Sequence, residues 1–242
     1  MNLLVDVGNT RLKYAFVRKN GEMQVGFQLS ALLPALQAAY QEQGAVDVFL
    51  AGSGSIPEEL RDLLRPFAGF WLERTPGMRY PVEIAYEPAG TLGIDRIAAC
   101  VGARELFPGK ELLVIDTGTA VTYNFLTAGG VLKGGDISPG VSLRFRALHD
   151  YTDKLPLLQP EPVWGRCGGG TGEAIRNGVM NGMLFEMERY IAEFQQDHPQ
   201  NEVVLTGGNS VYFEGRLPVY VRFCKELVFI GLQTILEFYK KM

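Results

Sequence analysis

Cysteine and histidine are scarce in this sequence, and neither occurs in a metal-binding or disulfide pattern. The three cysteines, Cys100, Cys167 and Cys224, are widely spaced and form no CxxC pair, which argues against a disulfide framework and a structural zinc site. The two histidines, His149 and His198, have no partner at metal-ligand spacing. We therefore expect a protein of a reducing, cytoplasmic compartment.

The sequence also lacks long apolar runs and basic tracts. No run approaches the ~18–20 residues of a membrane helix, and the amino terminus has neither region of a signal peptide. The 23 basic and 27 acidic residues are spread along the chain, with a net charge of −4, so no surface for nucleic acid or an anionic membrane is indicated. A small molecule is the expected partner.

What the sequence does contain is enough apolar residues, 47% of 242, to fill a large core. The expected elements follow one α/β plan twice, with a boundary near residues 108–111. In the first half we expect strands over 2–7, 12–17, 23–29 and 45–51, and helices over 30–43, from Pro57 and over 94–106, with Ser30 as a helix cap. In the second half we expect strands over 112–116, 120–126, 131–137 and 203–208, and helices from residue 140, over 172–196 and over 228–239.

Two segments about a hundred residues apart have nearly the same residue pattern, MNLLVDVGNTRLKYAF and LLVIDTGTAVTYNFL. When Asp6 is aligned with Asp116, a constant offset of 110 also places Gly8 on Gly118 and Phe16 on Leu126. A match without gaps over a whole hairpin favours duplication over accident.

Each copy places an aspartate at the end of a buried strand, followed by glycine and by hydroxyl or amide residues. Such turns let backbone N–H groups approach a phosphate closely, and a carboxylate there suits Mg²⁺, which binds through one or two carboxylates and retained waters. The alternative is that Asp6 and Asp116 only begin turns. Duplication in register favours a pair of phosphate-binding turns, and no G-x-x-x-x-G-K-[ST] sequence offers a P-loop instead.

DVGNTRLKYAF and IDTGTAVTYNF resemble the two phosphate motifs of the superfamily of actin, heat-shock ATPases, and sugar and acetate kinases. The segment Leu205-Thr206-Gly207-Gly208-Asn209 resembles that superfamily's adenosine motif. The resemblance implies an actin-like kinase fold: two ribonuclease-H-like α/β domains with mixed sheets, 1–110 and 111–242, and a nucleotide cleft between them.

YEPAGTLGIDRIAACVGA resembles the substrate motif of type III pantothenate kinases, and GGDISPGVSLRFRALH and TGEAIRNGVMNGM resemble that family too. The family resemblance implies ATP-dependent phosphorylation of pantothenate to 4'-phosphopantothenate, the first step of coenzyme A biosynthesis. It also implies Mg²⁺ with ATP, a monovalent cation (K⁺ or NH₄⁺), and a homodimer. The apolar and aromatic residues of 184–194 agree with a dimer surface.

The resemblance assigns roles to individual residues. It makes Asp95 the catalytic proton acceptor and Asp116 the ligand of the monovalent cation. From the chemistry of the phosphate turns we expect Asp6 to be a ligand of Mg²⁺, directly or through water. The residues that the resemblance places in substrate binding are Tyr86, Gly93, Ile94, Asp95, Arg96 and Thr171. Those that it places in ATP binding are Asp6, Val7, Gly8, Asn9, Thr10, Arg11, Leu12, Lys13, Thr119, Gly207 and Gly208.

Each assignment has a structural alternative. Asp95 could be an ordinary first-turn residue of a helix, Tyr86 a strand aromatic, Thr171 a helix cap and Lys13 a solvated charge. Asn124 stands where the family often has aspartate, which puts metal binding at that position in doubt. Two other functions stay open: a non-catalytic nucleotide-binding regulator, and a kinase for another small alcohol or acid. The Asp95–Arg96 pair favours catalysis.

Overall fold

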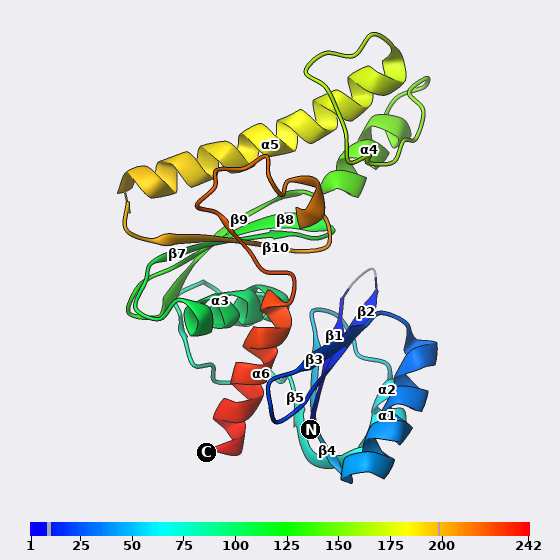
Figure 1. Cartoon of the computed structure of the whole chain (residues 1–242), viewed down its shortest axis with the longest axis vertical. Helices are drawn as coiled ribbons and strands as arrows, with labels where there is room; N and C mark the ends of the chain where they lie inside the picture. The colour runs from blue at the N-terminus through cyan, green and yellow to red at the C-terminus, as the bar shows by residue number, and fades with distance from the viewer. Residues whose placement is uncertain (9–10, 198) are drawn as a thin grey trace. The chain divides into compact units, whose positions relative to one another are not determined.

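The computed structural model describes residues 1–8, 11–197 and 199–242, and these form two compact units. Unit 1 comprises Met1–Leu106 and Leu227–Met242, and unit 2 comprises Phe107–Glu226. Figure 1 shows the elements of both units along the chain. Among the described residues, the model contains no helix that combines the length and the apolar character of a membrane span.

Unit 1 is built on a five-stranded sheet in the order β3-β2-β1-β4-β5. The first three strands are antiparallel neighbours, and β4 and β5 run parallel to β1. The strands are β1 (Asn2–Val7), β2 (Leu12–Val17), β3 (Met23–Gly26), β4 (Val46–Gly52) and β5 (Ala68–Glu73), with a short β6 (Glu83–Ile84) outside this sheet. The helices are α1 (Leu29–Gln43), α2 (Glu58–Leu64), α3 (Ile94–Leu106) and α6 (Leu227–Lys240), with 3₁₀ turns η1 (Arg65–Phe67) and η2 (Ala89–Thr91).

Helices cover both faces of this sheet. Alternate residues of a strand point to opposite sides, so a single strand contacts helices on both faces. Leu3 and Val5 of β1 belong to a buried cluster with Leu36 of α1 and Leu64 of α2. On the other face, the Asn2 amide Nδ2 donates to side chains of α6. Strand β1 is therefore buried on both sides, and its carboxyl end is fixed in place.

Helices α3 and α6 cross at two glycines with almost no space between their backbones. A Cβ atom on Gly231 would lie 1.8 Å from the Ala98 carbonyl oxygen, and one on Gly102 would lie 2.3 Å from the Leu227 carbonyl oxygen. Only glycine permits this approach. Helix α6 therefore groups with unit 1, whereas the expected domain division placed residues 111–242 together. The division at residue 110 otherwise falls close to the end of α3.

Unit 2 repeats the strand order of unit 1, with β11-β10-β7-β8-β9 matching β5-β4-β1-β2-β3. Its core joins Leu113 and Ile115 of β7 to Met180 and Met183 of the long helix α5. The strands are β7 (Leu112–Thr117), β8 (Ala120–Leu126), β9 (Val131–Pro139), β10 (Glu202–Thr206) and β11 (Arg222–Phe223), and the helices are α4 (Val141–Asp150), α5 (Thr171–Asp197) and the 3₁₀ turn η3 (Ser210–Tyr212). The shared order supports the duplication inferred from the sequence.

The constant offset of 110 is wrong for the second strand of each hairpin. Leu3 pairs with Phe16, whereas Leu113 pairs with Phe125 rather than with Leu126. The structural counterpart of Phe16 is therefore Phe125, at an offset of 109.

The shift arises in the turn between the paired strands. The last pair is Val7–Leu12 in the first hairpin and Thr117–Val121 in the second, so the second turn is one residue shorter. When the two hairpins are aligned with a one-residue gap in the turn, they match better, because Tyr14 then aligns with Tyr123 and Phe16 with Phe125.

A few predicted boundaries also change. The third strand ends at Gly26, where the Tyr14 ring occupies the place of a side chain. Helix α1 starts at Leu29 after an N-cap Gln28 without a side-chain cap, so Ser30 is not the cap. Pro57 is the N-cap of α2 rather than part of its first turn. Strands β5 and β11 were not predicted.

Candidate active site

Asp6 is a buried carboxylate at the carboxyl end of β1, with 5% of its surface exposed. Strand alternation places it on the same face as Asn2, which contacts α6. Burial raises the pKa of Asp6 to about 6, the positive charge of Lys13 lowers it, and the negative charge of Asp95 raises it further. Lys13 is the cross-strand partner of Asp6 in β2. Two of the three predicted carboxylates, Asp6 and Asp95, thus lie near Lys13 in unit 1.

Asp95 lies in the first turn of α3, where its position depends on the glycine before the helix. Its Oδ1 accepts the backbone N–H of Arg96 at 2.9 Å, and a Cβ on Gly93 would lie only 2.3 Å from the same oxygen. Any side chain at position 93 would therefore displace the carboxylate. Ile94 is fully buried and anchors the start of the helix.

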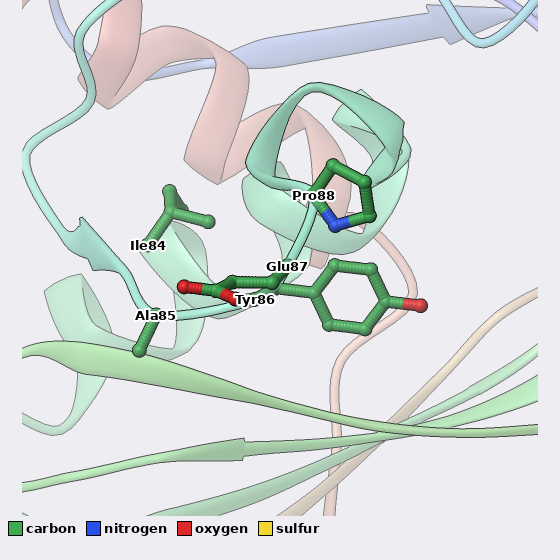
Figure 2. A pocket seen from close by; sticks show the side chains of 5 residues that line it. All are labelled: Ile84, Ala85, Tyr86, Glu87 and Pro88. Carbon is green, nitrogen blue, oxygen red and sulfur yellow. The ribbon is translucent and has the colours of Figure 1, made fainter.

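Tyr86 lines an open pocket of about 560 Å³ together with Ile84, Ala85, Glu87 and Pro88. Figure 2 shows these side chains, with the Tyr86 ring beside Pro88. The guanidinium of Arg96 lies 5.5 Å from the centre of the Tyr86 ring, within the range of a cation–π contact. Arg96 is 6% exposed. The residue after Asp95 thus places a positive charge beside a pocket wall.

The first phosphate turn is described only in part. The Gly8 N–H donates to the Arg11 carbonyl at 3.3 Å, and a Cβ on Gly8 would come within 3.2 Å of that oxygen. Val7 and Leu12 form the last pair below the turn. Asn9 and Thr10, both predicted to bind ATP, lie outside the described residues.

Asp116 and the segment 205–209, which is predicted to bind adenosine, meet in unit 2. Asp116 of β7 is the parallel partner of Thr206 of β10, and Gly207 has a φ of 95°, with its missing Cβ 2.4 Å from the Asp116 Oδ1. A larger residue at 207 would therefore meet the carboxylate. The Thr206 hydroxyl is buried and has no hydrogen-bond partner among the described residues.

Two residues absent from the predicted site tie the second phosphate turn to the adenosine segment. The Thr117 hydroxyl donates to the Thr206 carbonyl at 2.9 Å, and Asn209 donates to the Thr117 carbonyl from its backbone and to the Gly118 carbonyl from its Nδ2. Nothing lies within 4 Å of a Cβ on Gly208, and the Thr119 carbonyl accepts the Gly140 N–H. The structure therefore brings the four predicted positions 116, 119, 207 and 208 onto connected turns.

Thr171 is the first residue of α5, and the segment before it folds back along that helix. We call residues 164–170 the strap. The Gly165 N–H donates to Asn177 Oδ1, Asn181 Nδ2 donates to the Gly165 carbonyl, and Trp164 Nε1 donates to Asn181 Oδ1, each at 2.9 Å. Two asparagines one turn apart thus fix the strap, and no local pattern in the sequence marks them.

Asn124 is a buried residue of β8, and its Nδ2 donates to the Thr122 hydroxyl of the same strand and to the Val114 carbonyl of β7. The Asn124 amide therefore stabilises the pairing of these strands. Within the described ranges, no three histidine, cysteine, aspartate or glutamate side chains gather into a metal site. Any cation held at Asp116 would need backbone, hydroxyl or ligand oxygens as well.

The family model of type III pantothenate kinases matches residues 2–193. The chain belongs to the type III pantothenate kinase family. It is 38% identical over 240 residues to a type III pantothenate kinase of Porphyromonas gingivalis, covering 98% of each chain. It is 40% identical over 248 residues to one of Phocaeicola vulgatus, covering 100% of both. The predicted enzyme class, pantothenate kinase with ATP as donor, is confirmed.

Solved structures support the fold of this pantothenate kinase family member. A Campylobacter jejuni protein described as a Baf family transcriptional activator superposes with a TM-score of 0.63 at 19% identity, covering 99% and 100% of the two chains. A Sinorhizobium meliloti protein described as a 2-dehydro-3-deoxygalactonokinase gives 0.57 at 13% identity, covering all of both. At these identities the likeness concerns the fold alone, and the predicted actin-like α/β class is confirmed.

Proposed function

We propose that this kinase transfers the γ-phosphoryl group of ATP to the primary hydroxyl of pantothenate, with Asp95 as the proton acceptor. The observation that carries the proposal is the position of Asp95. Its carboxylate is fixed over Gly93 at the start of α3, directly before an arginine that contacts the pocket residue Tyr86.

Phosphoryl transfer depends more on the positioning of the reacting groups than on a strong base. Phosphoryl transfer passes through a loose transition state, so orientation and charge neutralisation carry most of the catalysis. Asp95 orients the hydroxyl and accepts its proton as the new P–O bond forms. Arg96 pairs with the pantothenate carboxylate, for which a guanidinium fork is better suited than an ammonium group. Tyr86, Gly93, Ile94 and Thr171 complete the proposed substrate contacts.

The nucleotide is proposed to contact residues 6–13 together with Thr119, Gly207 and Gly208. Asp6 suits Mg²⁺ because its carboxylate is buried and a metal ion would add to the positive charge of Lys13 in offsetting its negative charge. A magnesium ion bound there would neutralise charge on the phosphates. Lys13 is then a second positive group on the same strand end, and it orients the phosphates.

The monovalent cation is proposed to bind Asp116, and the surrounding residues fit such an ion. The carboxylate is next to the Gly207 backbone, and the buried Thr206 hydroxyl on the neighbouring strand has no partner of its own among the described residues. A hydroxyl and a carboxylate are suitable oxygen donors for a hard cation. We propose K⁺ or NH₄⁺ as the ion.

We further propose that the enzyme is a homodimer and works in the cytoplasm. Phe185 of α5, Leu143 of α4 and Ile137 of β9 expose 61%, 40% and 63% of their surfaces, and a partner subunit that covers them would remove apolar surface from water. The three cysteines are free thiols, which agrees with a reducing compartment.

The test is an ADP-release assay over a panel of small alcohols and acids that includes pantothenate. We expect ADP release that depends on pantothenate and yields one phosphopantothenate per ADP. Equal turnover with a sugar or with acetate would favour a different kinase. ADP release without any acceptor would indicate an ATPase, and ATP binding without turnover would indicate a regulator.

A further inference from the structure

Arg74 directly follows β5 and connects two parts of unit 1 that carry the carboxylates. Its backbone N–H donates to the Leu50 carbonyl of β4 at 3.1 Å. The next residue of β4, Ala51, is the parallel partner of Asp6. The backbone of Arg74 is therefore attached to the sheet beside the strand end on which Asp6 lies.

The side chain of Arg74 extends to the turn that precedes α3. Its Nη2 donates to the Leu92 carbonyl at 3.0 Å, and its positive charge is close enough to Tyr80 to lower the pKa of that phenol, against the larger raising effect of burial. Leu92 is buried, and the following residue, Gly93, is the one on which the Asp95 carboxylate lies. The arginine thus holds the peptide group between Leu92 and Gly93 from outside the helix.

An external anchor matters here because Gly93 has no side chain to restrict its own backbone. A rotation of that peptide would move the start of α3 and the Asp95 carboxylate with it. Burial is the main cause of the raised pKa of Asp6, and the negative charge of Asp95 is a smaller cause. The two carboxylates therefore lie within electrostatic range of each other. The distance between the two carboxylates depends on the hydrogen bonds that connect β4 through Arg74 to the peptide before Gly93.

We propose that Arg74 is a positioning residue for the phosphoryl transfer: through Leu92 it fixes the Asp95 carboxylate relative to the strand end that carries Asp6. The inference rests on the proposed role of Asp95 as the proton acceptor. Arginine suits the task because its guanidinium is planar and rigid, so its Nη2 donor is held in one direction toward the Leu92 carbonyl. A lysine at this position offers a flexible ammonium group, which would hold that carbonyl in a less fixed geometry.

Arg104 provides a matched control. It belongs to the last turn of α3, and its Nη1 donates to the Pro81 carbonyl in the loop that also contains Tyr80. Arg104→Met therefore removes a partly buried arginine–carbonyl bond from the same region without touching the Leu92–Gly93 peptide. A loss common to Arg74→Met and Arg104→Met reports general destabilisation of the loop.

The experiment measures kcat and both KM values for Arg74→Met, Arg74→Lys, Arg104→Met and Asp95→Asn, along with the urea midpoint of each protein. We expect Arg74→Met to lower kcat roughly tenfold to a hundredfold, since small misplacements of a reacting group have effects of this size, with the KM for ATP unchanged within about twofold. Arg74→Lys should lie between. Millimolar guanidinium should restore part of the kcat of Arg74→Met, whereas Arg104→Met should keep the wild-type kcat.

Two results would overturn the inference: wild-type kcat in Arg74→Met, or an equal loss in Arg104→Met with no rescue by guanidinium. If Arg74→Met does not fold, a wild-type kcat in a folded Arg74→Lys would overturn it as well. Asp95→Asn separates the two proposals. An active Asp95→Asn would remove the proposed function and the inference together, and an inactive Asp95→Asn beside an active Arg74→Met would remove the inference alone.

Discussion

The carboxylate of Asp6 lies within electrostatic range of the carboxylate of Asp95, and both residues belong to unit 1. Burial raises the pKa of Asp6 to about 6, and the negative charge of Asp95 contributes to the increase. Asp6 ends β1 and Asp95 begins α3. Lys13, the cross-strand partner of Asp6, partly offsets this charge. The fold therefore keeps two acidic groups and one basic group together at one end of the sheet.

Asp6→Asn should stabilise the nucleotide-free, metal-free protein at neutral pH. With a pKa of about 6 in the folded state and 3.8 as the reference, Asp6 binds more protons when folded than when unfolded between pH 4 and 6. Stability therefore falls as pH rises through this window, by about 3 kcal/mol in total. Urea unfolding should show a gain of up to this size for the variant at pH 7 and almost none near pH 4.

Asp153→Asn is the control for that measurement, because Asp153 is exposed. It should leave the free energy of unfolding unchanged at both pH values. A gain from Asp6→Asn that is the same at pH 4 and pH 7 would show that the charge of Asp6 is not its cause.

Gly207→Ala should destabilise unit 2 and weaken ATP binding, whereas Gly208→Ala should leave stability almost unchanged. Position 207 has a positive φ and its Cβ would meet Asp116 and the Thr117 backbone, while the space around position 208 is open. Left-handed backbone alone costs a non-glycine residue about 1–2 kcal/mol, and the contact with Asp116 adds to it. Thermal unfolding of both variants measures the difference, and equal midpoints would contradict the geometry.

Asn181→Ala should release the strap and raise the KM for pantothenate severalfold, if Thr171 contacts the substrate as proposed. The change removes the acceptor of Trp164 and the donor to Gly165, and two such bonds contribute about 1–3 kcal/mol together. Tryptic cleavage after the exposed Arg166 should become faster.

Arg189→Ala serves as the control on the same helix, since it removes only an exposed pair with Glu193. It should change neither the cleavage rate nor the KM. Fast cleavage of Asn181→Ala with an unchanged KM would mean that the strap does not position the substrate.

Gly231→Ala should destabilise the protein by about 3 kcal/mol or more, because its methyl group would enter the backbone of α3 at Ala98. Gly178→Ala, at an open and exposed helical position of α5, should instead stabilise it by about 0.5–1 kcal/mol. Chemical denaturation of the two variants tests whether α6 packs on α3 as described. A mild effect at position 231 would show that the crossing is loose.

Local sequence was sufficient where one segment determines its own structure. The hairpin strands Asn2–Val7 and Leu12–Val17 and the helix Ile94–Leu106 have the predicted bounds, because apolar runs are separated there by turn residues or carry helical spacing. Asp6 could be singled out because its hairpin is duplicated around Asp116, whereas Asp95 was singled out by the family resemblance, since on its own it reads as an ordinary first-turn residue of a helix.

Long-range packing could not be predicted in this way. The grouping of α6 with unit 1 depends on glycines 102 and 231, which are 129 positions apart in the sequence and have no local signature. The one-residue shift of the second hairpin depends on which residues pair. Arg74 resembles any loop arginine until its bonds to Leu50 and Leu92 are seen.

The most direct test of the account is the kcat of Asp95→Asn with pantothenate and ATP. The asparagine keeps the size of the side chain and its place over Gly93 but cannot accept the proton. We predict a kcat lower by about 10²–10⁴-fold, with the KM for pantothenate and the affinity for ATP changed only a few-fold. A kcat within threefold of the wild type would contradict the central claim that Asp95 accepts the proton.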